Sequence, residues 1–180
     1  MTVIAACVRN GKAAMASDAL GSMNDLALPG RRKLFDCGDA MLGFAGSITL
    51  LRPIKMLPAC QEGREEGFCY EVAGAVRQFV ADHGLDKDEY YCFVVVASLN
   101  GIWLVLPDGG VEKVDGEYWA VGSGGEVALG AMYALDLGGA EVDTMVEMGV
   151  RSACDLTLSC GGDVTILEMP KEKEKKKAKR

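Results

Sequence analysis

The start of the chain constrains the fold most, because it alternates strand-like segments with strong turn signals. Residues 2–9 begin apolar and β-branched, and Asn10-Gly11 follows them directly. This dipeptide favours a two-residue hairpin turn, since both turn positions need positive φ angles that Asn and Gly tolerate best. Residues 12–18 then supply the returning strand. The first eighteen residues therefore predict an antiparallel hairpin.

A second hairpin is predicted a short distance further along. Residues 33–37 and 40–45 read as strands that turn at Gly38-Asp39. Between the two hairpins, residues 19–30 are rich in Gly, Asn and Asp and end in Pro29-Gly30, so we expect a loop there. Four strands at the start of the chain predict an antiparallel sheet.

The hydrophobic period becomes helical after Gly46. Apolar residues from Ile48 to Leu57 predict a helix with Ser47 as its N-cap, residues 61–67 a polar connection, and residues 70–83 a second helix ended by Gly84. The remaining elements are predicted as strands at 90–97, 102–106, 111–114 and 117–121, helices at 126–137 and 142–155, and a closing strand at 163–169. Strands, two helices, strands, two helices and a strand predict an α+β domain.

Composition indicates one globular domain followed by a charged tail. The 180 residues are 49% hydrophobic and 25% charged, and no window approaches the ~20 apolar residues of a membrane span, so we expect a soluble protein without a membrane partner. Residues 171–180 carry a net charge of +5, which leaves −12 for the rest of a chain whose total is −7. So acidic a body does not favour nucleic-acid binding. We expect a domain over 1–169 and a disordered tail over 170–180, with docking of the tail onto an acidic partner as the less favoured alternative.

Cysteine and histidine usage narrows the chemistry. The 7 cysteines lack paired CxxC spacing, which is typical of reduced thiols in the cytoplasm, and 1 histidine offers no zinc site. That residue, His83, lies near the end of a predicted helix, where it would interact with the helix dipole. A hydrolase that uses a Ser–His or Cys–His pair is therefore disfavoured.

Thr2 is the first candidate for catalysis. A small residue after Met1 permits removal of the initiator methionine, which would leave Thr2 with a free α-amino group beside its own hydroxyl. Such a residue is nucleophile and base in one, because an amine with a pKa of about 7.7–8.0 can accept the hydroxyl proton directly or through one water. Considered alone, a threonine at this position more often only begins a strand.

Other motifs follow Thr2 at characteristic distances. They are Asp18 at the end of the first hairpin, Lys33 at the start of a strand, Gly43-Phe44-Ala45-Gly46, Gly122-Ser123-Gly124-Gly125, and Asp155 before Cys160-Gly161-Gly162. Together with Thr2 these motifs resemble the proteasome β-subunit and HslV family of N-terminal-nucleophile threonine proteases, over residues 2–169. The resemblance implies a four-layer αββα sandwich of two antiparallel sheets flanked by helix pairs.

The resemblance also implies roles for the residues around the nucleophile. Lys33 would lower the pKa of the Thr2 hydroxyl and stabilise the developing alkoxide, although Arg31 and Arg32 leave the register at this position open. Asp18 would hold the Lys33 ammonium. Gly46 would donate a backbone N–H to the oxyanion of the tetrahedral intermediate.

Four further roles follow from the same likeness. Ser123 would hydrogen-bond the Thr2 amine and relay protons, and Asp155 would accept a hydrogen bond from that amine and orient it. The spacing after Asp155 departs from that of proteasome subunits, which leaves Ser159 as the weaker candidate for a third polar group. The backbone around Ser22, together with Gly46, would bind an extended substrate by strand addition.

The resemblance implies a threonine-type endopeptidase subunit that acts on proteins or peptides inside stacked homo-oligomeric rings of six or seven subunits. It implies an ATP-driven unfoldase cap and a cytoplasmic location. No cofactor is required, while backbone carbonyls in some relatives hold a structural monovalent or divalent cation. Two alternatives stay open, an amidase of the same N-terminal-nucleophile type acting on a small amide, and a non-catalytic ring-forming scaffold.

Overall fold

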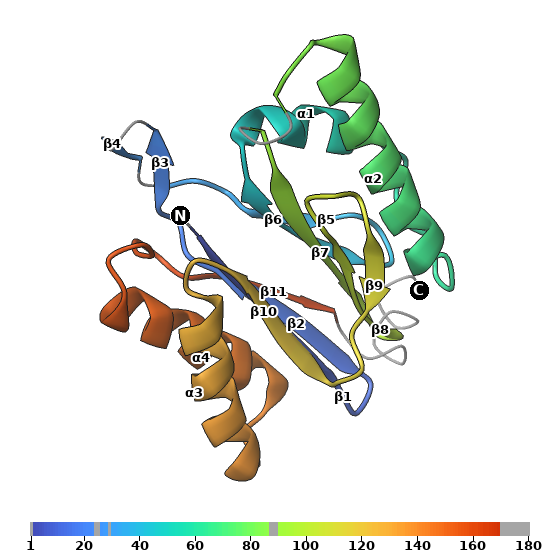
Figure 1. The fold of residues 1–180 in the computed structure, drawn as a ribbon. Helices are drawn as coiled ribbons and strands as arrows, with labels where there is room; N and C mark the ends of the chain where they lie inside the picture. Colours follow the sequence, from blue (N-terminus) through green and yellow to red (C-terminus); the bar gives the residue numbers. More distant parts are fainter. Residues whose placement is uncertain (1, 24–25, 29, 87–89, 170–180) are drawn as a thin grey trace, which may run out of the picture.

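Two antiparallel sheets lie face to face in the computed structural model, which describes residues 2–23, 26–28, 30–86 and 90–169 (Figure 1). The first sheet has the order β10-β1-β2-β11 and contains β1 (Val3–Arg9), β2 (Lys12–Ser17), β10 (Tyr118–Gly122) and β11 (Thr165–Met169). The second has the order β5-β6-β7-β8-β9 and contains β5 (Leu34–Asp36), β6 (Met41–Gly46), β7 (Cys92–Ser98), β8 (Gly101–Val105) and β9 (Val111–Lys113).

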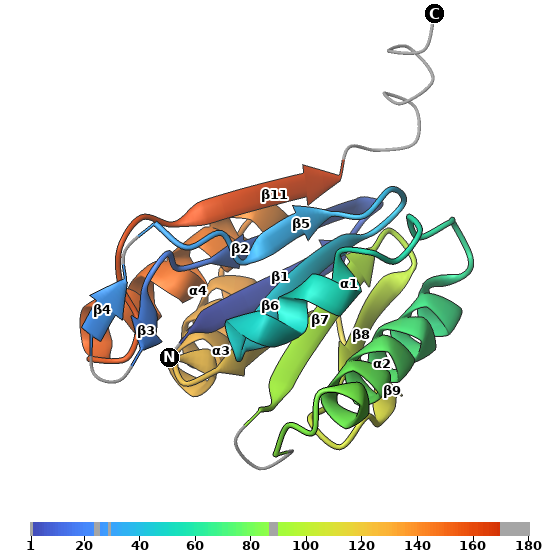
Figure 2. The ribbon, with the colours of Figure 1, turned by 90° about the horizontal axis from the view of Figure 1, so that it is seen from above.

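Helices cover the outer face of each sheet (Figure 2). The first sheet packs against α3 (Gly125–Leu137) and α4 (Val142–Leu156). The second packs against α1 (Leu51–Ile54), which follows the 3-10 turn η1 (Ile48–Leu50), and against α2 (Glu65–Asp82). This arrangement confirms the predicted αββα sandwich. In the part of the chain that the structure describes, no helix is long and apolar enough to cross a membrane.

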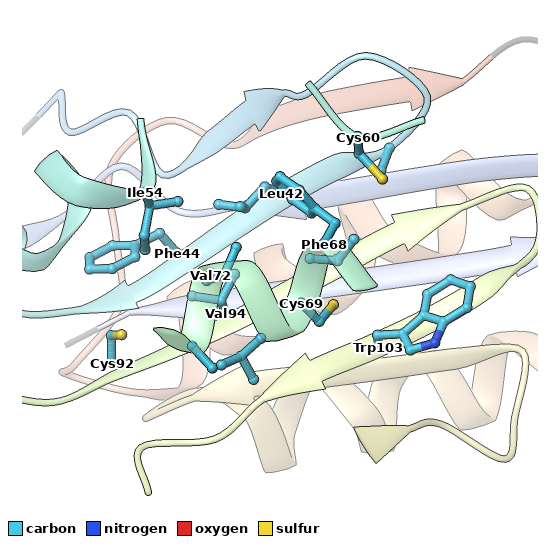
Figure 3. Close-up of a cluster of buried hydrophobic side chains, with 14 of the residues drawn as sticks. Leu42, Phe44, Ile54, Cys60, Phe68, Cys69, Val72, Cys92, Val94 and Trp103 are labelled. Atoms are coloured by element: carbon cyan, nitrogen blue, oxygen red, sulfur yellow. The ribbon is translucent and has the colours of Figure 1, made fainter. Parts of the chain in front are cut away.

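Apolar side chains fill all three spaces between these four layers. On β1, Val3 and Ala5 face the helices while Ile4 faces the opposite sheet, because successive side chains of a strand alternate. The middle layer is tight at Gly43, where an added Cβ would lie 2.6 Å from Ile4 Cγ2. The layer under α1 and α2 is shown in Figure 3, with side chains such as Leu42 packed beneath the helices.

The first hairpin places β1 in the interior of its sheet. Asn10 and Gly11 have φ angles of 53° and 71°, which confirms the predicted turn. Beyond it β2 pairs with β1, and β10 pairs with the other edge of β1. The start of β1 therefore lies between the last residues of two neighbouring strands, and this position defines the candidate site.

The expected loop over 19–30 is wrong in part. It contains β3 (Gly21–Met23) and β4 (Leu26–Leu28), which pair with each other as a separate two-stranded sheet. Strands of three residues with Gly and Asn nearby carry too little hydrophobic alternation to be distinguished from a loop.

Two helix boundaries also differ from expectation. The predicted helix after Gly46 is only η1 followed by the single turn α1, and Ser47 makes no side-chain cap hydrogen bond. Pro58 helps to explain the short helix, because the residue before a proline, here Leu57, is disfavoured from the α-helical conformation. The next helix begins at Glu65, inside the expected polar connection, because the Glu65 side chain is buried rather than solvated. The expected disorder of the tail concerns 170–180, which lies outside the described residues.

Candidate active site

Strand pairing brings Thr2 between two of the residues predicted from sequence. Val3 is opposite Gly122 on β10, and Ile4 is opposite Ser17 on β2. Continuing each ladder by one residue places Thr2 beside Ser123 and near Asp18. Thr2 itself is buried, with an exposed fraction of 8%.

Asp18 is a fully buried carboxylate that joins three separate segments. Its Oδ1 accepts hydrogen bonds from the Val3 backbone N–H at 2.9 Å and from Lys33 Nζ at 2.6 Å. Its Oδ2 accepts a hydrogen bond from the Gly161 backbone N–H at 3.2 Å. A buried carboxylate must be paired and hydrogen-bonded in this way to offset the loss of hydration. Asp18 therefore fixes Lys33 relative to the residue that follows Thr2.

Lys33 is a buried cation with a carboxylate on one side and a carbonyl on the other. Besides Asp18, its Nζ donates a hydrogen bond to the Leu20 carbonyl at 2.6 Å. Burial lowers the pKa of the Lys33 ammonium below its ordinary value, and the hydrogen bond to Asp18 opposes that shift. These contacts place Lys33, rather than Arg31 or Arg32, in the site, because both arginines are exposed.

Ser123 contacts Thr2 through both of its hydrogen-bonding functions. The Thr2 backbone nitrogen donates to Ser123 Oγ at 3.1 Å, and Ser123 Oγ donates to the Thr2 carbonyl at 3.3 Å. Glycines allow this approach: an added Cβ at Gly122, whose φ is 93°, would lie 2.2 Å from the Thr2 carbonyl oxygen. At Gly124 a Cβ would lie 2.6 Å from Cys160 Sγ. The glycines of the Gly-Ser-Gly-Gly segment therefore let its backbone approach the Thr2 backbone closely.

Gly46 ends β6 on the surface, where another residue could not fit. Its φ is 151°, and an added Cβ would lie 2.3 Å from the Tyr91 carbonyl oxygen. The next residue, Ser47, donates its backbone N–H to that same carbonyl at 3.0 Å. The close contact with β7 thus holds the turn after Gly46 in one conformation.

The remaining candidates form no hydrogen bond with Thr2 among the described residues. Asp155 is exposed on the last turn of α4, and it forms no hydrogen bond with Thr2 in the part of the chain that the structure describes. Ser159 Oγ donates instead to Thr157 Oγ1 at 3.3 Å. Ser22 lies in β3, opposite Ala27. The catalytic role given to Asp155, the weaker one given to Ser159 and the substrate-binding role given to Ser22 stay predictions.

Cys154 and the possible metal ligands are the alternatives to Thr2. All seven thiols are free, and burial raises the pKa of Cys154, which lies near Lys33, to about 11. A thiol with so high a pKa is protonated and unreactive at neutral pH. Among the described residues no three His, Cys, Asp or Glu side chains are grouped to hold a metal ion.

Sequence reasoning did not identify the backbone groups that complete the site. The Leu20 carbonyl and the Gly161 N–H hold Lys33 and Asp18, respectively. Any residue offers such groups, so no residue type signals them. Together the site has a hydroxyl and nitrogen at Thr2, a polar contact from Ser123 and a buried ammonium nearby. Such a set can move a proton and stabilise negative charge on oxygen.

Known proteins similar to this chain include HslV protease subunits and structures of the same fold. No protein-family model matches the chain. The ATP-dependent protease subunit HslV of Staphylococcus carnosus is 32% identical over 143 residues, which cover 74% of this chain and 76% of that protein. The structure of Thiobacillus denitrificans BPH in complex with epoxomicin has a TM-score of 0.80 and 22% identity, covering 95% of this chain and 100% of that one. HslV from Trypanosoma brucei has a TM-score of 0.68 and 19% identity over 93% of this chain and 98% of its own. The two structural likenesses concern the fold alone.

Proposed function

Because the chain belongs to the HslV family of protease subunits, we propose that Thr2, exposed by removal of Met1, is the nucleophile with which it hydrolyses peptide bonds. The chain is a peptidase of the N-terminal-nucleophile fold, as the sequence predicted. The observation that supports Thr2 is the continuous set of contacts from Ser123 to the Thr2 nitrogen and from Val3 through Asp18 to Lys33. Residues from four distant parts of the sequence meet at the chain start.

The reaction proceeds in two halves. Thr2 Oγ attacks the substrate carbonyl carbon and its proton passes to the free α-amine, with Ser123 as the neighbouring relay. The Gly46 N–H stabilises the resulting oxyanion and the Lys33 ammonium stabilises negative charge at Oγ. The C–N bond then breaks, the leaving amine takes the proton from the α-ammonium, and an ester on Thr2 remains. Water deprotonated by the α-amine attacks that ester, releases the acid and restores Thr2.

Membership of the HslV family also suggests an oligomeric assembly and an ATPase partner. The Staphylococcus carnosus relative is named an ATP-dependent protease subunit, so we propose an ATPase partner that delivers protein substrates and a ring in which the sites face a shared chamber. The same proposal includes two stacked rings with six or seven subunits each and a cytoplasmic location. It also includes a structural cation and no catalytic cofactor.

The experiment compares Thr2→Ala and Thr2→Ser with the wild-type protein, using casein, a fluorogenic peptide and a small amide as substrates. We expect the wild type to cleave casein and the peptide, Thr2→Ala to lose at least about a thousandfold in kcat/KM, and assembly to be unchanged by gel filtration. Thr2→Ser keeps a hydroxyl and should retain measurable activity. Cleavage of the small amide alone would favour the amidase, while wild-type inactivity on all three substrates would favour the scaffold.

A further inference from the structure

A cavity with a positively charged lining lies next to the candidate site. It has a volume of about 620 Å³ and is lined by four cationic side chains, Arg31, Arg32, Arg52 and Lys55. Its other lining residues are Gly30 and the apolar Ile48, Leu51 and Met56, so no carboxylate lines it. In a chain with a net charge of −7, four cations without an acid are an unusual local excess. We refer to this space as the cationic cavity.

The walls of the cationic cavity continue directly from site residues. Arg31 and Arg32 immediately precede Lys33, and Ile48 follows Gly46 by two residues. The β5–β6 ladder pairs Leu34 with Gly43, and it extends one residue further because the Phe44 N–H donates to the Lys33 carbonyl at 2.9 Å. The ladder does not continue to Arg31, whose N–H donates instead to the Ala19 carbonyl at 2.9 Å, so Arg31 contacts the segment that directly follows Asp18. In both ribbon views, the helical segment that begins at Ile48 starts near the end of the sandwich that holds the chain start (Figures 1 and 2).

Among the described residues, no carboxylate pairs with the charges of this cavity. Arg32 donates from Nε to the Leu34 carbonyl at 2.9 Å, and Lys55 Nζ lies 4.8 Å from the centre of the Phe35 ring. Both side chains are thus held at the cavity by neutral partners. Arg31 and Arg52 are exposed and available to an incoming anion.

We propose that the cationic cavity selects substrates with an acidic side chain, Asp or Glu, on the residue whose carbonyl Thr2 attacks. The inference rests on the proposed function. Attack fixes the carbonyl carbon between Thr2 Oγ and the Gly46 N–H, so the side chain on the adjoining Cα lies beside the walls that continue from Lys33 and Gly46. Arginines bind carboxylates in bidentate geometry, and the apolar wall of Ile48, Leu51 and Met56 accommodates the methylene groups of Glu.

Three fluorogenic peptides that differ only in Glu, Leu or Lys at the acyl position test this selection. The measured quantity is kcat/KM of the assembled wild-type protein without an ATPase, so that delivery of folded substrates plays no part. We expect Glu to exceed Leu by about tenfold or more and Lys to be the poorest substrate. The preference should shrink as salt rises from 0.05 to about 0.5 M, because exposed charges are screened.

Charge reversal in the cavity provides the specific test. Arg52→Glu should lower the Glu-to-Leu ratio of kcat/KM at least about tenfold. Arg52→Lys should keep most of the preference. The control is Arg64→Glu, since Arg64 is an exposed arginine on the N-terminal side of α2 that does not line the cavity. It should leave the ratio unchanged.

The outcomes separate this inference from the proposed function. Hydrolysis that depends on Thr2 but shows equal or better use of Leu overturns the acidic preference and leaves the proposed nucleophile standing. A Glu preference that Arg52→Glu and Arg64→Glu reduce equally also overturns it, because general surface charge would then explain the effect. Failure of every peptide in the wild type would contradict the proposed function and this inference together.

Discussion

Replacing Asp18 with Asn tests whether the buried ion pair organises the site. Asn is nearly isosteric, and its Oδ1 can still accept from the Val3 N–H and from Lys33 Nζ, whose distances to Asp18 Oδ1 are 2.9 and 2.6 Å. Two things are lost. The Lys33 ammonium, with 8% of its side chain exposed, loses its counter-charge, and the new Nδ2 donor faces the Gly161 N–H that now donates to Oδ2 at 3.2 Å.

The expected magnitude follows from these contacts. Breaking a buried ion pair by removing one partner costs about 3–5 kcal/mol, a large part of the roughly 5–15 kcal/mol that stabilises a typical domain. We also expect kcat/KM to fall at least about a hundredfold, because Lys33 is no longer held as a cation. Urea unfolding followed by circular dichroism and hydrolysis of a fluorogenic peptide measure the two effects. A variant that unfolds at the wild-type urea concentration and keeps wild-type activity would refute the reasoning.

Three further predictions follow from particular contacts. Burial lowers the pKa of Lys33, so peptidase activity should fall on the alkaline side at a pH below the ordinary lysine pKa near 10.5. The free energy of unfolding should rise with pH between the lowered pKa and 10.5, because the unfolded chain binds more protons there. A pH–rate profile without an alkaline fall below 10.5 would contradict this prediction. Gly124→Ala should cost about 1–3 kcal/mol of stability and lower activity, since its Cβ would lie 2.6 Å from Cys160 Sγ and 2.9 Å from Ala153 Cβ. Gly130→Ala is the control and should not destabilise the protein, because nothing lies within 4 Å of its added Cβ. Equal melting temperatures of the two variants would count against close packing at Gly124. Glu65→Ala should cost about 1–3 kcal/mol of stability at pH 7, and Glu65→Gln much less, because Ser98 and Asn100 both donate to Oε1 at 2.8 Å. Burial raises the pKa of Glu65, but its hydrogen bonds outweigh burial and lower the pKa overall, so the wild-type advantage should be present above about pH 4.5 and disappear as the pH falls through the lowered pKa. Identical denaturation of the two variants would refute the role of Oε1.

Elements with a strong hydrophobic period or a distinctive turn were predictable from sequence. Asn10-Gly11, the run Phe93-Val94-Val95-Val96 and the helices after Gly125 and Gly139 all form as expected. They are specified by neighbouring residues, which the sequence shows directly. The short strands β3 and β4 and the early start of α2 depend instead on distant partners. Glu65 is buried only because Ser98 and Asn100, more than thirty residues away, supply its hydrogen bonds.

The candidate site was predictable to the same extent. Asp18, Lys33 and Ser123 were singled out by the family resemblance, and the structure brings them together around the chain start. Asp155 lies in the last turn of α4 and Ser159 just beyond it, where the spacing already departs from that of proteasome subunits, and neither forms a hydrogen bond with Thr2 among the described residues. The cationic cavity could not be predicted, because Arg31 and Arg52 are brought together only by the turn after Gly46.

The identity of the first residue in active protein tests the central claim most directly. Intact-mass and N-terminal peptide mass spectrometry should be run on the same sample whose peptidase activity has been measured. The account predicts that the active protein begins with Thr2, and that a variant engineered to retain Met1 is inactive though still folded. Full activity in protein that retains Met1 would contradict the claim, because the Thr2 nitrogen would then be an amide that cannot act as a base.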